Sequence, residues 1–194
     1  MQSVIHSSAS LFFTYKHNGE TNMNYAGIEP VNITNGPGLR VCLFVSGCRR
    51  HCKNCFNPET WDFNYGNHFD KEAKDKILKY LSEPHINGLT ILGGEPMEKE
   101  NQKDVANLIA EIRKKLPEKT IWVFTGYTFE ELNDPAKNYT EYTKQILNNI
   151  DVLVDGPFIQ EKKDLSLKFR GSSNQRLIDM NKTRNEGHIV IHEI

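Results

Sequence analysis

Residues 41–55 read VCLFVSGCRRHCKNC, an apolar run followed directly by three cysteines within eight residues. The run at 41–45 is short, apolar and β-branched, which predicts a buried strand. Cys48, Cys52 and Cys55 then follow with the spacing Cys-x3-Cys-x2-Cys in one loop. A strand that leads into a loop rich in potential ligands is typical of α/β folds, which bind ligands at the carboxyl ends of their strands.

These three thiolates can hold three corners of an iron–sulfur cubane. A 4Fe–4S cluster normally takes four cysteines, and the chain has no second cysteine cluster. Three ligands leave one iron open, and an open position distinguishes a reactive metal site from a structural one. We therefore expect the chemistry to occur at the fourth iron.

The remaining cysteine, Cys42, is predicted to belong to the core. It lies within the predicted strand, and four extended steps of about 3.3 Å already separate it from the loop by roughly 13 Å. A buried free cysteine usually behaves as a small hydrophobic side chain.

Two other uses of clustered cysteines are less favoured. A zinc site completed by His51 or a distant histidine normally pairs two short Cys/His spacings, separated by a dozen or more residues. No such second half is found in the chain. Disulfides belong to secreted domains, and three thiols this close suit a metal better than cross-links.

Composition sets further bounds. The chain has 194 residues, enough for one domain with its own core, and a formal net charge of -1 that provides no basic field for nucleic acid. No apolar stretch approaches the roughly 18 residues that span a membrane. The apolar run at 11–13 is too short for a signal peptide. We expect a cytoplasmic protein with no membrane or nucleic-acid partner.

From residue 39 onward, predicted strands alternate with predicted helices. Strands are expected at 39–45, 89–92, 121–124 and 152–154, with shorter candidates at 177–178 and 189–191. Helices are expected at 70–81, 101–116, 128–132 and 139–150. This alternation predicts parallel βαβ units, but a closed eight-fold barrel typically needs about 250 residues. We therefore predict an α/β fold, a partial, open (β/α) TIM-like barrel.

Glycine-containing loops follow the predicted strands. Gly93 and Gly94 allow close backbone approach and positive φ, so the loop can bind a cationic amino group, to which Glu95 adds negative charge. The alternative is an ordinary strand-to-helix turn with Pro96 in the first helical turn. The loops at 35–38, 125–127 and 155–158 are weaker signals, since glycine and proline mark most turns. Composition alone favours a solvated turn at 170–176.

Together these residues resemble the radical S-adenosylmethionine enzymes, most closely the family that activates anaerobic ribonucleoside-triphosphate reductase, a glycyl-radical enzyme. The resemblance spans about residues 23–180 and lies in the segments 35–40, 44–48, 52–61, 88–96, 151–158 and 169–176. The segment 169–176 separates this family from other short radical enzymes. Phe56 stands where the family usually has tyrosine. The family commonly begins near Met23, so we expect an N-terminal extension at 1–22 and a single domain at 23–194.

The resemblance implies a site and an oxidoreductase reaction. Cys48, Cys52 and Cys55 would hold a 4Fe–4S cluster whose open iron binds S-adenosylmethionine. Gly93 and Gly94 would bind the methionyl amino group. Further cofactor contacts are implied at Asn54, Cys55, Phe56 and Glu95. One electron from the reduced cluster then cleaves the cofactor to methionine and a deoxyadenosyl radical, which takes a hydrogen from the Cα of a glycine in the large catalytic subunit of the reductase.

The resemblance also implies partners. The substrate is another protein whose glycine loop enters the open barrel, and Asp155, Phe158 and Arg170 are candidates for receiving it. A one-electron donor such as flavodoxin or ferredoxin is required. Arg49 and Arg50 contact the partner or stay solvated, and solvation is the commoner fate of adjacent charges.

Two other functions stay open at this point. One is a radical S-adenosylmethionine enzyme that acts on a small molecule, which would cleave the cofactor but ignore the reductase. The other is a non-catalytic iron–sulfur or zinc module, which would bind no S-adenosylmethionine. Three cysteines instead of four disfavour simple electron transfer.

Overall fold

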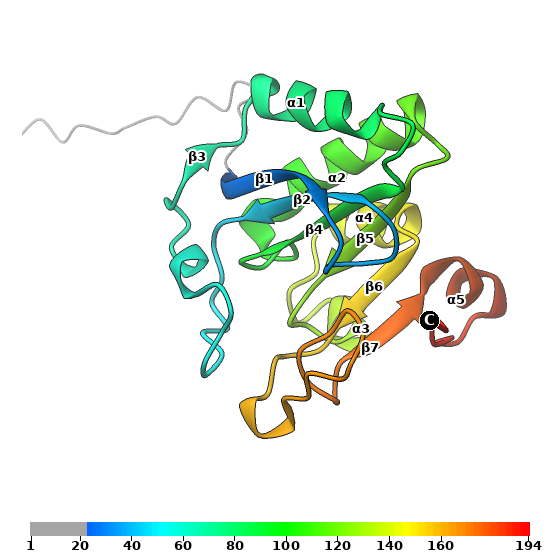
Figure 1. Cartoon of the computed structure of the whole chain (residues 1–194). Helices are drawn as coiled ribbons and strands as arrows, with labels where there is room; N and C mark the ends of the chain where they lie inside the picture. Colours follow the sequence, from blue (N-terminus) through cyan, green and yellow to red (C-terminus); the bar gives the residue numbers. More distant parts are fainter. Residues whose placement is uncertain (1–22) are drawn as a thin grey trace, which may run out of the picture.

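The computed structural model describes residues 23–194, so the expected extension at 1–22 lies outside the described residues. Seven strands form one open sheet in the order β3-β1-β2-β4-β5-β6-β7 (Figure 1). The strands are β1 (Asn24–Asn32), β2 (Arg40–Val45), β3 (Asn67–His68), β4 (Gly88–Gly93), β5 (Thr120–Phe124), β6 (Val152–Asp155) and β7 (Arg176–Asp179). The helices are α1 (Lys71–Leu81), α2 (Lys99–Lys115), α3 (Phe129–Leu132), α4 (Glu141–Asn149) and α5 (Met180–Glu186).

The sheet is mixed. Strands β2, β4, β5 and β6 run parallel, which confirms the parallel pairing predicted for the centre of the sheet. Strands β1 and β7 pair antiparallel with β2 and β6. Strands β1 and β3, helix α5 and the antiparallel direction of β7 were not predicted. A strand at 189–191 was a wrong prediction, because this segment contributes only the isolated bridge between Ile178 and Ile191.

Side chains alternate between the two faces along each strand, so each face of the sheet has its own hydrophobic core. In the parallel pair β2–β4, Val41 lies opposite Leu89 and Leu43 opposite Ile91, and all four belong to a core shared with the helices. Figure 1 shows α1, α2 and α4 along this side of the sheet. A smaller cluster occupies the other face, formed by Trp122, Val152, Val154 and Leu177 with Phe124 and Phe169 packed against it.

Cys42 confirms its predicted place in the core. Its side chain is fully buried within β2. Burial raises the pKa of the Cys42 thiol to about 12, against a weaker opposing effect of the Asn35 amide 3.8 Å away. The thiol therefore stays protonated and acts as a small apolar group.

Side-chain caps define the helix starts within one or two residues of the predicted positions. Asp70 accepts a hydrogen bond from the Ala73 amide and caps α1 instead of belonging to it. Thr128 and Thr140 form capping boxes at α3 and α4. Such caps satisfy amides that the first helical turn leaves unpaired.

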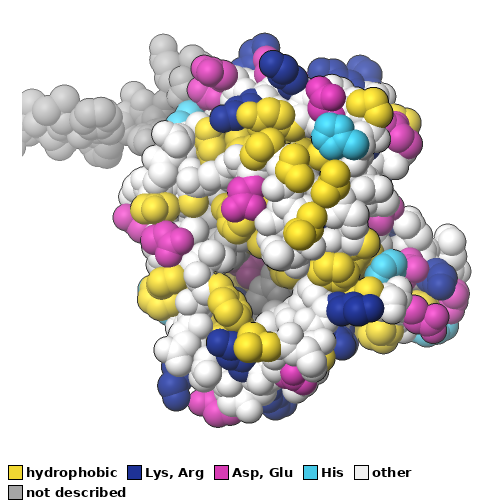
Figure 2. Space-filling view, viewed as in Figure 1, with side chains coloured by type: hydrophobic (Ala, Val, Ile, Leu, Met, Phe, Trp, Pro, Cys, Tyr) yellow, Lys and Arg dark blue, Asp and Glu magenta, His cyan; other side chains and the backbone are white. Residues whose placement is uncertain are grey.

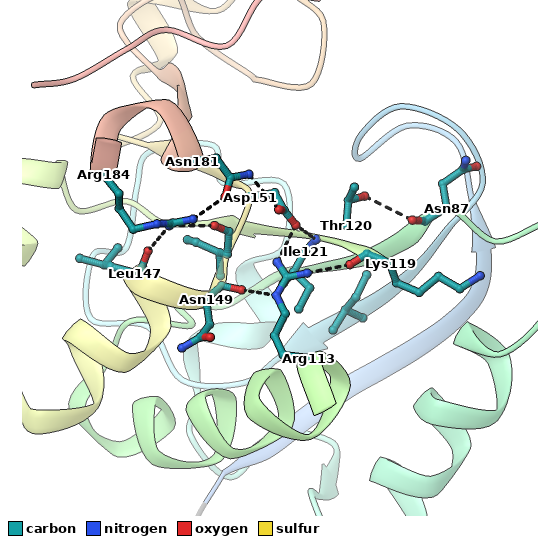
Figure 3. A network of polar contacts seen from close by, with 12 residues as sticks. Asn87, Arg113, Lys119, Thr120, Ile121, Leu147, Asn149, Asp151, Asn181 and Arg184 are labelled. Atoms are coloured by element: carbon teal, nitrogen blue, oxygen red, sulfur yellow. Dashed lines mark hydrogen bonds and ion pairs between the residues drawn. The ribbon is translucent and has the colours of Figure 1, made fainter. Parts of the chain in front are cut away.

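A polar network fixes the amino ends of the parallel strands (Figure 3). Asp151 lies just before β6, and its Oδ2 accepts from Arg113 Nη2 at 2.6 Å and from the Ile121 amide at 2.7 Å. Asn181 of α5 donates to the other carboxylate oxygen at 3.0 Å. Burial by itself would raise the pKa of Asp151, but the hydrogen bonds from Arg113, Ile121 and Asn181 outweigh it, so this pKa is lowered. The network ties α2, β5, β6 and α5 together at the end of the sheet away from the site.

The substitution Asp151→Ala is expected to lower the free energy of unfolding by about 3 kcal/mol at pH 7, because it leaves the Arg113 guanidinium without its partner in a largely buried place. The folded pKa of Asp151 lies below its unfolded value, which is about 3.9. Its stabilisation is therefore present above about pH 4 and is lost as the pH falls through the folded pKa.

Urea denaturation of wild type and Asp151→Ala at pH 7 and pH 3 measures this effect. The difference in free energy of unfolding between wild type and Asp151→Ala should be smaller at pH 3 than at pH 7. Lys71→Ala, which removes only an exposed pair with Asp75, should change stability little. Equal stability of wild type and Asp151→Ala at pH 7 would contradict the role assigned to the network.

Candidate functional site

A cavity of about 480 Å³ lies at the carboxyl ends of the parallel strands. It opens as the hollow on the face shown in Figure 2. Most of the residues predicted for the site line it together: Cys48, Cys52, Cys55, Phe56, Gly93, Gly94, Glu95, Phe158 and Arg170. The location agrees with ligand binding at the carboxyl ends of strands in α/β folds.

Two predicted residues do not line this cavity. Asn54 is exposed and has a left-handed backbone with φ of 57°, which turns the loop between Cys52 and Cys55. Asp155 is fully buried below the cavity, where Arg176 binds both of its oxygens and the Phe129 amide donates at 2.7 Å. Its carboxylate is therefore occupied by the chain itself.

The cysteine loop is shaped by its own backbone. The Gly47 amide donates to Thr60 O at 2.8 Å, and the Cys48 amide donates to Trp61 O at 3.1 Å. Cys48 is buried, which raises the pKa of its thiol to about 11. A bound metal would lower that pKa, because a coordinating thiol is deprotonated.

The donor set fits an iron–sulfur cluster. All three thiols are free, and they line one cavity. Among residues 23–194, no three His, Cys, Asp or Glu side chains converge as a single metal ion would require. A cubane does not need such convergence, because each thiolate binds a different iron.

The loop after β4 packs directly against the cysteine loop. Gly94 N donates to Val45 O at 2.8 Å, and Glu95 N donates to Gly47 O at 2.9 Å. Gly93 has a φ of +103°, and a Cβ there would lie 2.8 Å from both Phe44 Cα and Val45 O. Only glycine allows this approach. The alternative of an ordinary turn with Pro96 in the first helical turn is wrong, because α2 begins at Lys99.

The Glu95 side chain links this loop to the loop after β5. It is 1% exposed, and its carboxylate accepts hydrogen bonds from Thr125 Oγ1 and the Gly126 amide, both at 2.7 Å. Burial raises the pKa of Glu95 to about 7, although these hydrogen bonds and one from the Met97 amide oppose the shift. Glu95 therefore joins two strand ends beside the cavity.

The wall opposite the cysteine loop is an internally bonded segment. Gln175 Oε1 accepts from the Gly171 and Ser172 amides, and Gln175 Nε2 donates to Gly156 O at 3.1 Å. Arg170 Nη1 donates to the Gln175 carbonyl at 3.1 Å, while its Nε is buried without a hydrogen-bond partner. The solvated turn that composition favoured at 170–176 is therefore a wrong prediction.

Two phenylalanines meet across the mouth of the cavity. Phe56 comes from the cysteine loop and Phe158 from the opposite wall, and their ring centroids are 5.1 Å apart. Phe56 is 59% exposed, so part of its ring faces solvent.

The two arginines of the cysteine loop have different environments. Arg49 stays solvated, with 57% of its side chain exposed, and also pairs with Glu98 at 2.9 Å and with Glu100 at 2.6 Å. Arg50 turns into the cavity and lies over the Tyr127 ring at 4.9 Å. Sequence reasoning missed these contacts because their partners lie far along the chain. It also missed lining residues such as Phe44, Trp61, Phe124 and Gln175.

No helix among the described residues is long and apolar enough to cross a membrane.

Comparison with known proteins gives a consistent result. A family model described as a 4Fe-4S single cluster domain matches residues 34–178. The anaerobic ribonucleoside-triphosphate reductase-activating protein of Vibrio cholerae is 43% identical over 155 residues, which cover 79% of this chain and 96% of that protein. The protein of the same name from Escherichia coli K12 is 44% identical over the same shares of both chains. The one from phage T4 is 38% identical over 157 residues, which cover 80% of this chain and 93% of the phage protein.

Proposed function

The chain belongs to the family of anaerobic ribonucleoside-triphosphate reductase-activating proteins, and we propose that it generates a glycyl radical on the large subunit of that reductase. It is an iron–sulfur oxidoreductase that acts by reductive cleavage of S-adenosylmethionine. The observation that carries this proposal is the meeting of three free thiols with the Gly93–Gly94 backbone in one cavity.

Each part of the cavity has a role in this proposal. Cys48, Cys52 and Cys55 hold a 4Fe–4S cluster with one iron left open. When bound, the reduced cluster and S-adenosylmethionine supply a deoxyadenosyl radical that removes a hydrogen atom from a glycine Cα. The backbone at Gly93 and Gly94 receives the methionyl amino group. Phe56 offers an aromatic face for the adenine, and the turn at Asn54 presents Cys55.

The walls limit the access of water to the reacting groups. Phe44, Phe124 and Phe158 supply apolar side chains to the lining of the cavity. Excluding water protects reactive intermediates from side reactions. In this proposal the open sheet acts as a partial barrel of the radical S-adenosylmethionine type, with the helices outside and the cavity inside.

The protein substrate approaches the cavity on the side where Phe56 and Phe158 line it. Arg170 also lines the cavity and keeps a buried Nε without a partner, which supports a contact with the incoming glycine loop. Asp155 acts indirectly, since its carboxylate holds Arg176. A one-electron donor of the flavodoxin or ferredoxin kind would supply the electron that this reaction needs. The four free cysteines suit a reducing compartment, and we place the reaction in the cytoplasm.

Incubation of the reconstituted protein with the reductase, S-adenosylmethionine and a reductant tests this function. We expect methionine to form and a glycyl radical to appear on the large subunit, detected by electron paramagnetic resonance. Methionine without a glycyl radical would instead support a radical enzyme that acts on a small molecule.

The substitution Arg170→Ala is expected to lower activation of the reductase about tenfold, the effect of losing one strong interface contact. Cleavage of S-adenosylmethionine without the reductase should stay within about twofold of wild type, because the role proposed for Arg170 is toward the glycine loop. Lys162→Ala, which removes an exposed cation from the same wall, serves as the control. An equal fall of both activities in Arg170→Ala would rule out a docking role.

A further inference from the structure

Asn101 lies in the first helical turns of α2 and joins the two loops that build the site. Its Nδ2 donates to Ser46 O at 2.9 Å and to Glu95 O at 3.0 Å, and the residue is 1% exposed. Ser46 lies two residues before Cys48, and Glu95 directly follows Gly94. One buried side-chain amide thus holds the cysteine loop and the loop after β4 together.

We propose that Asn101 is a positioning residue that sets the separation of these two loops, and with it the separation of the cluster from the methionyl end of the cofactor. The inference rests on the proposed function for its consequence in catalysis. The hydrogen bonds of Asn101 to Ser46 and Glu95 lie within the polypeptide and do not depend on a bound cofactor.

The chemistry of the contact requires an amide at this position. Both neighbours of the Asn101 nitrogen are carbonyl oxygens, which accept but cannot donate, so the NH2 group must face them. Aspartate has nearly the same shape but no donor in its ionised form. Alanine would remove the bond to both carbonyls; Glu95 O keeps the bond from the Glu98 amide, whereas Ser46 O loses this partner, and an unmet buried acceptor is costly.

The support of Asn101 is rigid. The backbone N–H of Asn101 donates to Glu98 O at 2.9 Å. Helix α2 also buries Val105, Leu108 and Ile109 in the core that the sheet shares with the helices. Two direct backbone bonds also join the loops, from Gly94 to Val45 and from Glu95 to Gly47. Asn101 adds a tie anchored in the helix, which matters because misplacement of a reacting group by about 1 Å can reduce a rate about 100-fold.

The next residue, Gln102, provides a matched control. It is also fully buried in α2, and its side chain donates to Met97 O at 2.8 Å and to Asn138 O at 2.9 Å. It also accepts from Thr143 Oγ1 at 2.6 Å. These bonds hold Met97, just before α2, and residues around the start of α4, and none of them reaches the cysteine loop. Substitution of Gln102 should therefore destabilise the fold without releasing that loop.

Hydrogen exchange of the cluster-free protein tests the inference independently of catalysis. In Asn101→Ala, the amides of Gly94 and Glu95 are expected to exchange at least about tenfold faster than in wild type, compared at equal global stability from urea denaturation. In Gln102→Ala they should stay within about twofold after the same correction. Equal acceleration in both variants, or none in Asn101→Ala, would overturn the positioning role.

Binding of S-adenosylmethionine to the reconstituted protein gives a second readout. Asn101→Asp keeps the size of the side chain and serves as a second variant if Asn101→Ala does not fold. It is expected to bind the cofactor about tenfold more weakly, which is in the range seen for supporting residues of metal sites. Its iron content should match wild type, and Gln102→Ala should bind normally. Normal binding by Asn101→Asp would count against the inference. Failure of wild type to bind would instead remove the proposed function, and hydrogen exchange would still decide the role of Asn101.

Discussion

Serine at Cys48, Cys52 or Cys55 is expected to abolish assembly of the 4Fe–4S cluster. Loss of even a supporting residue around a metal site typically costs about 10–100-fold in affinity or activity, and loss of a direct ligand should exceed that. Each of the three thiols lines the cavity and is free of disulfides. Iron and sulfide per protein after anaerobic reconstitution measure the effect, together with methionine release from S-adenosylmethionine.

Cys42→Ala is the matched control for these variants. Cys42 is fully buried within β2 and does not line the cavity, so its removal should leave the iron content unchanged. A loss of iron in Cys42→Ala equal to that in the three serine variants would make Cys42 a fourth ligand. That result would remove the open iron on which the proposed chemistry depends.

Gly93→Ala is expected to lower the free energy of unfolding by roughly 2–6 kcal/mol, from backbone strain and overpacking of about 1–3 kcal/mol each. The φ of +103° is unfavourable for alanine, and the new Cβ would lie 2.8 Å from two backbone atoms of β2. Backbone atoms cannot move away as a flexible side chain can, so the loop after β4 must move away from the end of β2 and from the cysteine loop that follows it. We therefore also expect a loss of S-adenosylmethionine binding.

Gly27→Ala separates this effect from a general effect of replacing glycine. Gly27 lies in β1, where a Cβ would meet no atom within 4 Å and φ is not in the positive range. The free energy of unfolding of Gly27→Ala, measured in urea, should stay close to that of wild type. Equal stability of Gly93→Ala and Gly27→Ala would contradict the close packing of the loop after β4 on the cysteine loop.

The central strands could be predicted because they are encoded locally. Parallel strands buried on both faces appear as continuous apolar runs, and β2, β4, β5 and β6 have this pattern. Strand β1 was missed because it contains Gly27 and Pro30, residues that usually weaken a strand. The direction in which β7 pairs leaves no mark in its own four residues, since it depends on where the chain re-enters the sheet.

The site, like the fold, could be predicted where its signals are local in the sequence and not where they depend on distant residues. Cysteine spacing and paired glycines are local signals, and the structure brings the three cysteines and both glycines to one cavity. The ion pair of Arg49 could not be predicted, because its partner Glu98 lies 49 residues away. Asn101 gave no signal, because its two acceptors meet only when the ends of β2 and β4 lie side by side.

Electron paramagnetic resonance of the anaerobically reconstituted, reduced protein, with and without S-adenosylmethionine, tests the central claim most directly. An iron left open by three cysteines predicts a 4Fe–4S signal that changes when the cofactor is added. A cluster signal that ignores the cofactor, or a protein that takes up zinc alone, would contradict the account and leave a binding module in its place.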